Sequence, residues 1–148
     1  MGTVINGVNL TKLKVIDVSG GDVLHAMKAF DKGYEGFGAA YFSIIQKQVI
    51  KGWKLHNDMT LNLVVPIGIV RFILLDNRKD SPTYGNFQEV ILSRENYNRL
   101  TVPPMIWLGF QGLDEKDSLL LNIANIPHNP NEMIHKKLNE IDFDWEVE

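Results

Sequence analysis

The chain of 148 residues contains no cysteine. This absence excludes disulfide bonds, thiolate catalysis and zinc sites with cysteine ligands, so any metal would have to be bound by histidine and carboxylate side chains. No apolar run approaches the ~20 residues that span a membrane. The N-terminus also lacks the basic segment followed by an apolar one that marks a signal peptide. We therefore expect a cytoplasmic protein without a membrane partner.

An excess of charge of one sign is also missing. The sequence has 15 Lys and Arg residues against 18 Asp and Glu residues, which gives a net charge of -3. This balance argues against nucleic acid as a partner, because domains that bind nucleic acid are usually basic. It still allows a local basic pocket that binds a small anion. The length is that of one average domain, so we expect residues 1–148 to form a single domain.

Short β-like runs dominate the chain from residue 40 onward. Residues 40–50 read as a strand, and six more runs follow at nearly regular spacing, over residues 61–66, 69–76, 87–92, 99–102, 106–110 and 118–123. This spacing, with little helix between the runs, predicts an antiparallel sandwich or barrel. The runs LNLVV (61–65) and RFILL (71–75) are too apolar for a sheet with one wet face. We expect both of their faces to be covered, and dimerisation would cover them.

The flanking segments predict a hairpin and two short helices. Residues 4–18 alternate apolar and polar side chains around the turn pair Asn6-Gly7, which predicts an opening hairpin. Asp22 is placed to cap a helix over residues 23–30, and residues 131–138 combine a capping arrangement with an apolar stripe. The tail, residues 141–148, alternates acidic and apolar residues, and its two aromatic side chains indicate that it docks on the body of the protein.

Several motifs between residues 40 and 130 occur together in a consistent order. They are VIKGWKLH (49–56), LNLVVPIG (61–68), LDNRKDSPTYG (75–85), LSRENY (92–97), VPPMIWLGF (102–110) and IPHNP (126–130). This series resembles the nucleotide-sugar 3,5-epimerases of the dTDP-4-dehydrorhamnose 3,5-epimerase type. The resemblance implies an all-β fold, a cupin-type jelly-roll β-barrel with short flanking helices, and a homodimer.

The resemblance also implies a chemistry. The family holds a nucleoside-diphosphate 4-keto-6-deoxysugar inside the barrel and epimerises it without a metal or another cofactor. The residues agree, because metal-binding cupins normally supply a closely spaced His pair and a Glu, whereas Lys54-Leu55-His56 has one imidazole. Epimerisation beside a ketone needs a base that removes the α-proton, a donor or cation that holds the enolate oxygen, and an acid on the opposite ring face.

All three of these positions differ from the family pattern. The family's base is the His of an R-G-x-H motif, where this chain has Lys54. The related sugar 3,4-ketoisomerases carry G-x-H-x-H, of which this chain keeps the second imidazole, His56. The family's enolate-stabilising Lys falls at Asn62, and its catalytic Tyr falls near Asn122. His56 is then a base or proton shuttle, or a structural histidine. Lys54 is a base, a cation for phosphate or carbonyl, or a surface charge.

Three more residues are candidates for substrate binding. Lys51 stands where the family has an Arg near the diphosphate, and it keeps the charge without the bidentate geometry. Trp107 either stacks on the sugar or base, or belongs to the core. His128 falls where the family has an active-site aromatic residue, and it is either a donor to the sugar or a solvated loop residue.

Two charged residues each have two alternative interpretations. Arg78 matches a substrate-binding Arg region of the family and can pair with the diphosphate; the alternative is a salt bridge to Asp76 or Asp80 within the same turn. Asp144 in the tail is either the carboxylate that orients the imidazole or a surface acid.

These observations lead to one expected function and two alternatives. The expected function is a sugar-nucleotide isomerase that epimerises C3, C5 or both. The alternatives are a sugar 3,4-ketoisomerase, whose first His is missing here, and a non-catalytic relative that binds sugar nucleotides. The expected catalytic residues are His56 and Lys54, and the expected substrate-binding residues are Lys51, Asn62, Arg78, Trp107, Asn122 and His128.

Overall fold

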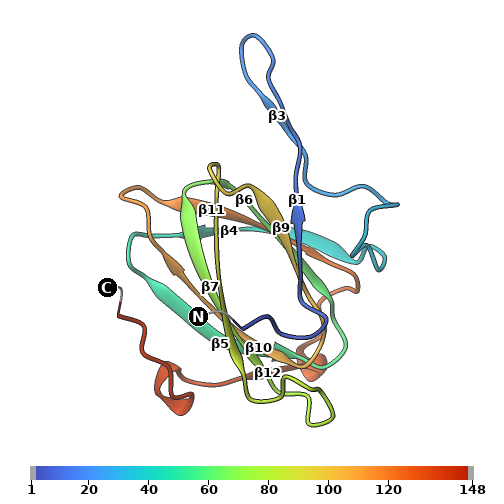
Figure 1. Cartoon of the computed structure of the whole chain (residues 1–148), viewed down its shortest axis with the longest axis vertical. Coiled ribbons are helices and arrows are strands. Elements are labelled where there is room, and N and C mark those ends of the chain that lie inside the picture. Colours follow the sequence, from blue (N-terminus) through green and yellow to red (C-terminus); the bar gives the residue numbers. More distant parts are fainter. Residues whose placement is uncertain (1–2, 147–148) are drawn as a thin grey trace.

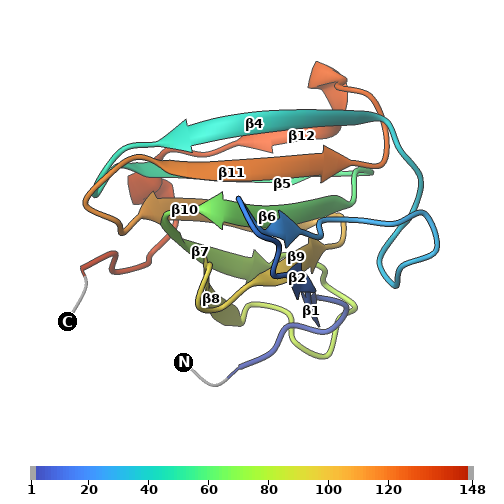
Figure 2. The same ribbon diagram turned by 90° about the horizontal axis from the view of Figure 1, so that it is seen from above.

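A computed structural model of the chain describes residues 3–146 and shows two packed antiparallel sheets (Figures 1 and 2). Sheet I has the strand order β1-β9-β6-β11-β4, and sheet II has the order β12-β5-β10-β7-β8. The strands of sheet I are β1 (Asn9–Lys12), β4 (Ala39–Ile45), β6 (Leu61–Ile67), β9 (Asn98–Val102) and β11 (Ser118–Ala124). Those of sheet II are β5 (Ile50–His56), β7 (Ile69–Asp76), β8 (Phe87–Ser93), β10 (Ile106–Gly112) and β12 (Met133–His135). The predicted jelly-roll barrel is confirmed.

The main core fills the space between the two sheets. Alternate residues of each strand point inward, as the period of two requires; in β6 and β7 these include Leu63, Val65 and Phe72, which are at most 1% exposed. Burying side chains of this size contributes roughly 1.5–3 kcal/mol each. The core therefore holds the two sheets face to face.

The chain itself covers the far faces of the apolar strands. On sheet II, Ile73 packs with Trp53 and with the tail residues Phe143 and Trp145. The Trp53 and Trp145 rings lie 5.3 Å apart, and Arg71 Nη1 donates to the carbonyl of Trp145 at 3.0 Å. Docking of the tail is thus confirmed for residues 141–146; the rest of the predicted segment lies outside the described residues. The cover expected from a partner comes here from the same chain.

The predicted helix over residues 23–30 is wrong. Val23–Leu24 forms β3, which pairs with β2 (Val15–Ile16) in a two-stranded arm. Gly20 and Gly21, with φ of 91° and 151°, reverse the chain at the tip of this arm. The predicted opening hairpin at Asn6-Gly7 is also wrong, because the strand that follows pairs with β9 instead of folding back on residues 4–5.

The predicted helix over residues 131–138 is wrong as well. Pro130–Glu132 forms one 3-10 turn, and Met133–His135 then extends to pair with β5 at the edge of sheet II. A second 3-10 turn spans Leu138–Glu140. Pairing with an open sheet edge satisfies the backbone donors and acceptors of this segment, and its weak helical pattern is too short to compete. Within residues 3–146, the only helical elements are these two 3-10 turns. No helix in this part of the chain is long and apolar enough to cross a membrane.

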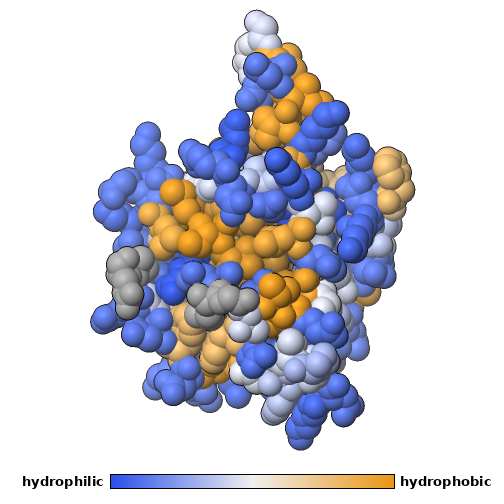
Figure 3. All heavy atoms as spheres, in the orientation of Figure 1, coloured by the Kyte–Doolittle hydropathy of each residue, from blue (hydrophilic) through white to orange (hydrophobic). Residues whose placement is uncertain are grey.

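The arm made of β2 and β3 projects from the body of the protein (Figure 1). Its apolar side chains are unusually open to solvent, since Val15, Ile16, Val18 and Val23 are between 38% and 49% exposed. They form an apolar surface on the projection (Figure 3). A two-stranded ribbon of this length is only marginally stable in water by itself. A second molecule that covered these apolar side chains would stabilise the arm.

Candidate active site

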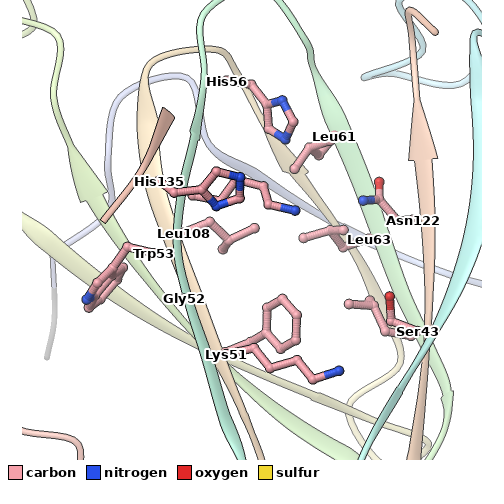
Figure 4. A pocket seen from close by; sticks show the side chains of 13 residues that line it. Ser43, Lys51, Gly52, Trp53, His56, Leu61, Leu63, Leu108, Asn122 and His135 are labelled. Atoms are coloured by element: carbon pink, nitrogen blue, oxygen red, sulfur yellow. The ribbon is translucent and has the colours of Figure 1, made fainter. Parts of the chain in front are cut away.

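A cavity of about 320 Å³ opens between the sheets where β5 and β12 face β6 and β11. In Figure 4, His56, His135 and Lys51 extend from the sheet II side, and Asn122 and Ser43 extend from the sheet I side. The lining residues are Ser43, Lys51, Gly52, Trp53, Lys54, His56, Leu61, Leu63, Leu108, Phe110, Leu120, Asn122 and His135. The cavity therefore has a basic wall, a polar wall and an apolar floor.

A bulge in β5 brings both lysines to this cavity. Residues three apart on a regular strand face opposite sides, yet both Lys51 and Lys54 line the space. The register explains this, because Leu108 pairs with Lys54 while Phe110 pairs with Lys51, which places two residues of β5 opposite one residue of β10. The extra residue restores Lys51 to the inner face. A sequence pattern read with a period of two does not show this.

His56 is held by a buried carboxylate. Its Nδ1 lies 2.5 Å from Glu132 Oε1, and the two side chains are 11% and 4% exposed. The other oxygen of Glu132 accepts the backbone N–H groups of Asp58 at 3.1 Å and Met59 at 3.2 Å. Burial raises the pKa of Glu132, but the hydrogen bonds from His56 and from these two N–H groups outweigh it, so its pKa lies below the ordinary value.

This pairing fixes the tautomer of the imidazole. An ionised carboxylate can only accept hydrogen bonds, so Nδ1 of His56 carries the proton that is donated to Glu132. In the neutral ring Nε2 then keeps its lone pair, and the ring lines the cavity. A histidine oriented by a carboxylate in this way is prepared to accept a proton from a bound molecule.

The other basic groups stand close to His56 on the same wall. His135 pairs with Lys54 in the β12–β5 register, and Met133 pairs with His56. Side chains two residues apart share a face, so Lys54, His56 and His135 all point inward. No carboxylate is among the lining residues described for this cavity. Its electrostatic character therefore favours an anionic ligand.

Two predicted site residues have structural roles away from the cavity. Asn62 faces the outer side of sheet I, where its amide donates to the carbonyl of Gly33 at 3.0 Å and accepts from Thr101 Oγ1 at 2.6 Å. Arg78 forms a salt bridge to Asp76, the alternative to diphosphate binding, with two hydrogen bonds at 2.9 and 3.0 Å. Neither residue lines the cavity: Asn62 lies between Leu61 and Leu63, which face the cavity, and therefore points to the other face of the sheet, while Arg78 is held by Asp76 in its own turn.

Asp76 is the centre of that turn and provides a test of the fold independent of the site. Its side chain is fully buried and accepts from Arg78, Ser81 and Thr83. Burial alone would raise the pKa of Asp76, but these hydrogen bonds outweigh that effect and hold the pKa well below the ordinary range. An ionised carboxylate with these partners stabilises the fold of the turn.

We expect Asp76→Ala to lower the free energy of unfolding by about 3–5 kcal/mol at pH 7, because it leaves Arg78 without its partner. The pKa of Asp76 is lower in the folded than in the unfolded state, so its contribution is complete well above ~3.9 and is lost as the pH falls below that value. Urea denaturation between pH 3 and 7 checks both points. An equal loss at every pH would contradict this role of the ionised carboxylate.

Three other predicted residues also lie outside the cavity. Trp107 belongs to the hydrophobic core, as the alternative interpretation had it. It packs on the outer face of sheet II, and Lys136 Nζ lies 4.9 Å from its ring centre. His128 is exposed in the loop between β11 and β12. Asp144 accepts the backbone N–H of Glu146 at 3.0 Å and leaves the orientation of His56 to Glu132.

Three residues of the site were not predicted from the sequence: Ser43, Glu132 and His135. Glu132 and His135 reach His56 only through the pairing of β12 with β5, across more than 70 residues of sequence. The available signal was the extended run Met133–His135, which was read as helix. Among residues 3–146, no three His, Asp or Glu side chains are placed to hold a metal ion.

The strand order defines a cupin-type barrel, and the basic cavity inside it is the candidate site. A sequence profile of the dTDP-4-dehydrorhamnose 3,5-epimerase family matches residues 3–148, and the chain belongs to this family.

Individual relatives agree with this assignment. The chain is 29% identical over 84 residues to the probable low-salt glycan biosynthesis epimerase of Haloferax volcanii; the match covers 56% of this chain and about half, 54%, of that relative. The dTDP sugar isomerase of Desulfovibrio desulfuricans G20 is 35% identical, with a TM-score of 0.92 and coverage of 95% and 92% of the two chains. The dTDP-6-deoxy-D-glucose-3,5-epimerase of Legionella pneumophila, solved with dTDP-4-keto-L-rhamnose, shares the fold at 24% identity, with a TM-score of 0.84 and coverage of 99% and 82%.

Proposed function

We propose that the protein is a sugar-nucleotide isomerase that epimerises a nucleoside-diphosphate 4-keto-6-deoxysugar by removing the proton next to the ketone. The observation that carries this proposal is the His56–Glu132 pair beside Lys54 in the cavity. The ligand named for the Legionella relative supports the substrate class.

In this mechanism each basic residue has its own task. His56 Nε2 takes the α-proton, and Glu132 stabilises the imidazolium that forms. Lys54 or its neighbour His135 holds the negative charge that develops on the carbonyl oxygen. Lys51, at the far end of the β5 bulge, binds the diphosphate. General-base catalysis of this kind contributes typically ~10²–10⁴-fold in rate.

The opposite wall limits what the reaction can be. It supplies Asn122 and Ser43, neither of which is an acid near neutral pH. Together they can hold a water molecule that returns a proton to the other face of the sugar, and the hydroxide left behind is neutralised by the proton that His56 releases to solvent. A reaction at one carbon needs a single proton abstracted by His56, and this arrangement favours it over a double inversion. A 3,4-keto shift is the second candidate, because it too needs one base beside the ketone.

Product analysis separates these functions. The protein is incubated with the 4-keto-6-deoxyhexoses of dTDP, CDP, GDP and UDP, and the products are identified by NMR. An epimer at C3 or C5 supports the proposal, whereas a 3-keto product identifies the keto-shift enzyme. Binding of all four nucleotides without any new sugar would contradict an enzymatic role and support a binding protein.

We propose that the protein acts as a homodimer in which the arm contacts a second copy. The arm and the outer face of β4 both present apolar side chains, and on β4 Phe42 and Ile44 are 67% and 59% exposed. β4 is also an unpaired edge of sheet I. Monomeric proteins rarely keep such apolar patches and open edges in water.

We expect Val23→Glu, which puts a charge on the arm, to convert the dimer to a monomer. Light scattering coupled to size exclusion should then give 16.8 kDa for the variant and twice that mass for the wild type. Val4→Glu, a change at an exposed valine outside the arm, should leave the dimer intact and serves as the control. A monomeric wild type at micromolar concentration would rule the dimer out.

A further inference from the structure

A second cavity lies on the outer face of sheet I. Its volume is about 190 Å³, and it is enclosed by residues 11–14, the segment 25–32 and Arg99 of β9. Leu100 points into the core between the sheets, so its neighbour Arg99 points to the outer face. This cavity shares no lining residue with the candidate active site, and sheet I separates the two.

Positive charge is concentrated around this small space. Five of the 15 Lys and Arg residues of the chain line it, together with His25; they are Lys12, Lys14, Lys28, Lys32 and Arg99. The one acidic lining residue, Asp31, is already paired with Arg99 at 3.3 Å. Within residues 3–146, no ion pair involves any of the four lysines. The four lysines are exposed, so water and salt screen the repulsion between their ammonium groups, and an anion between them would lower it further.

The framework that holds these lysines is well ordered. Arg99 is fully buried, and its Nη atoms donate to the carbonyls of Ala26 at 2.7 Å and Lys32 at 3.0 Å. Asp31 also accepts the backbone N–H of Lys28 at 2.9 Å. These bonds tie the segment 26–32 to sheet I. Among the described residues, the buried Nε of Arg99 has no hydrogen-bond partner, so this lining residue keeps one unsatisfied N–H donor.

We propose that this cavity binds a phosphate or diphosphate group, separately from the candidate active site. Lysine ammonium groups bind phosphate oxygens as point charges, without the planar bidentate geometry that an arginine guanidinium uses. The volume equals that of about six water molecules, which suits one such group. A long polyanion is disfavoured, because the charged lining residues sum to +4 and leave -7 on the rest of the chain.

Calorimetric titration with inorganic diphosphate tests the proposal in the variant Lys51→Ala/Lys54→Ala, whose candidate active site has lost its two lysines. We expect one diphosphate to bind per chain. Adding Lys12→Ala/Lys28→Ala should weaken this binding at least tenfold. Adding Lys79→Ala/Lys116→Ala, which removes two exposed lysines elsewhere, should change it less than twofold.

Three results would overturn the proposal: no binding in the starting variant, equal weakening by the two added pairs, or no weakening by Lys12→Ala/Lys28→Ala. Thermal melts of each variant show whether the fold is kept, so lost binding is not confused with unfolding. Titration with phosphate and with a nucleoside diphosphate then identifies the source of the group. Equal affinity for inorganic and nucleoside diphosphate indicates recognition of the diphosphate alone, and tighter binding of the nucleotide indicates contacts beyond it.

Discussion

A protein carrying His56→Ala is expected to turn over its nucleotide sugar about a thousandfold more slowly than the wild type, with little change in binding. The reason is that the bond from Nδ1 of His56 to Glu132 leaves the lone pair on Nε2 available to take a proton from the bound sugar. Loss of a general base costs typically ~10²–10⁴-fold in rate. Binding depends instead on the lysines and should persist. Product formation followed by NMR, with affinity measured separately by calorimetry, separates these two effects.

Removing the imidazole also leaves Glu132 buried without its partner, which can destabilise the protein. His56→Asn is therefore tested beside His56→Ala, because its side-chain amide can still donate to the carboxylate. Both should be inactive, and His56→Asn should melt closer to the wild type. Lys79→Ala, a change at an exposed turn residue, is the control and should keep full activity. A His56→Asn variant that remains active would show that another group removes the proton.

Glu132→Gln should separate catalysis from stability. The amide can still accept a backbone N–H from Asp58 or Met59, but it turns an N–H donor toward Nδ1 of His56. The imidazole must then accept at Nδ1 and carry its proton on Nε2, which is the wrong tautomer for a base. We expect kcat to fall at least a hundredfold, with a loss in the free energy of unfolding of about 1 kcal/mol or less.

Glu132→Ala provides the comparison for that measurement. It leaves two buried backbone N–H groups without acceptors, so we expect it to lose activity and to lower the free energy of unfolding by about 2–4 kcal/mol. Glu95→Gln, at an exposed position, should change neither property. If Glu132→Gln is as active as the wild type, the carboxylate does not set the tautomer and serves only to close the loop.

The barrel could be predicted from the sequence because its signal is local. The strands from Leu61–Ile67 to Ser118–Ala124 carry their own β patterns, and the turn residues between them limit the register. The predictions for the arm and for the β12 segment failed because the structure of these segments depends on pairing with distant residues. Val23–Leu24 and Met133–His135 are short apolar runs that fit either period, and tertiary pairing decides which one forms.

The site was predictable only in part, for the same physical reason. His56, Lys54, Lys51 and Asn122 all line the cavity. Asn122 lies on a strand with a clear pattern, whereas the other three lie on β5, which the motif VIKGWKLH indicated and the strand pattern did not. Glu132 and His135 depend on an edge pairing that no local pattern signals. Arg78 was misplaced because a charged side chain near a turn finds local partners first. Asn62 was misplaced because it points to the outer face of sheet I, where it bonds Gly33 and Thr101.

The most direct test of the account is proton exchange at the carbon next to the ketone. The wild-type protein is incubated in D2O with its nucleoside-diphosphate 4-keto-6-deoxysugar, and the recovered sugar is examined by NMR and mass spectrometry. The account predicts deuterium at C3 or C5 with the wild type and none above the uncatalysed background with His56→Asn. Product without deuterium, or the same deuterium content with His56→Asn, would contradict the claim that His56 removes this proton.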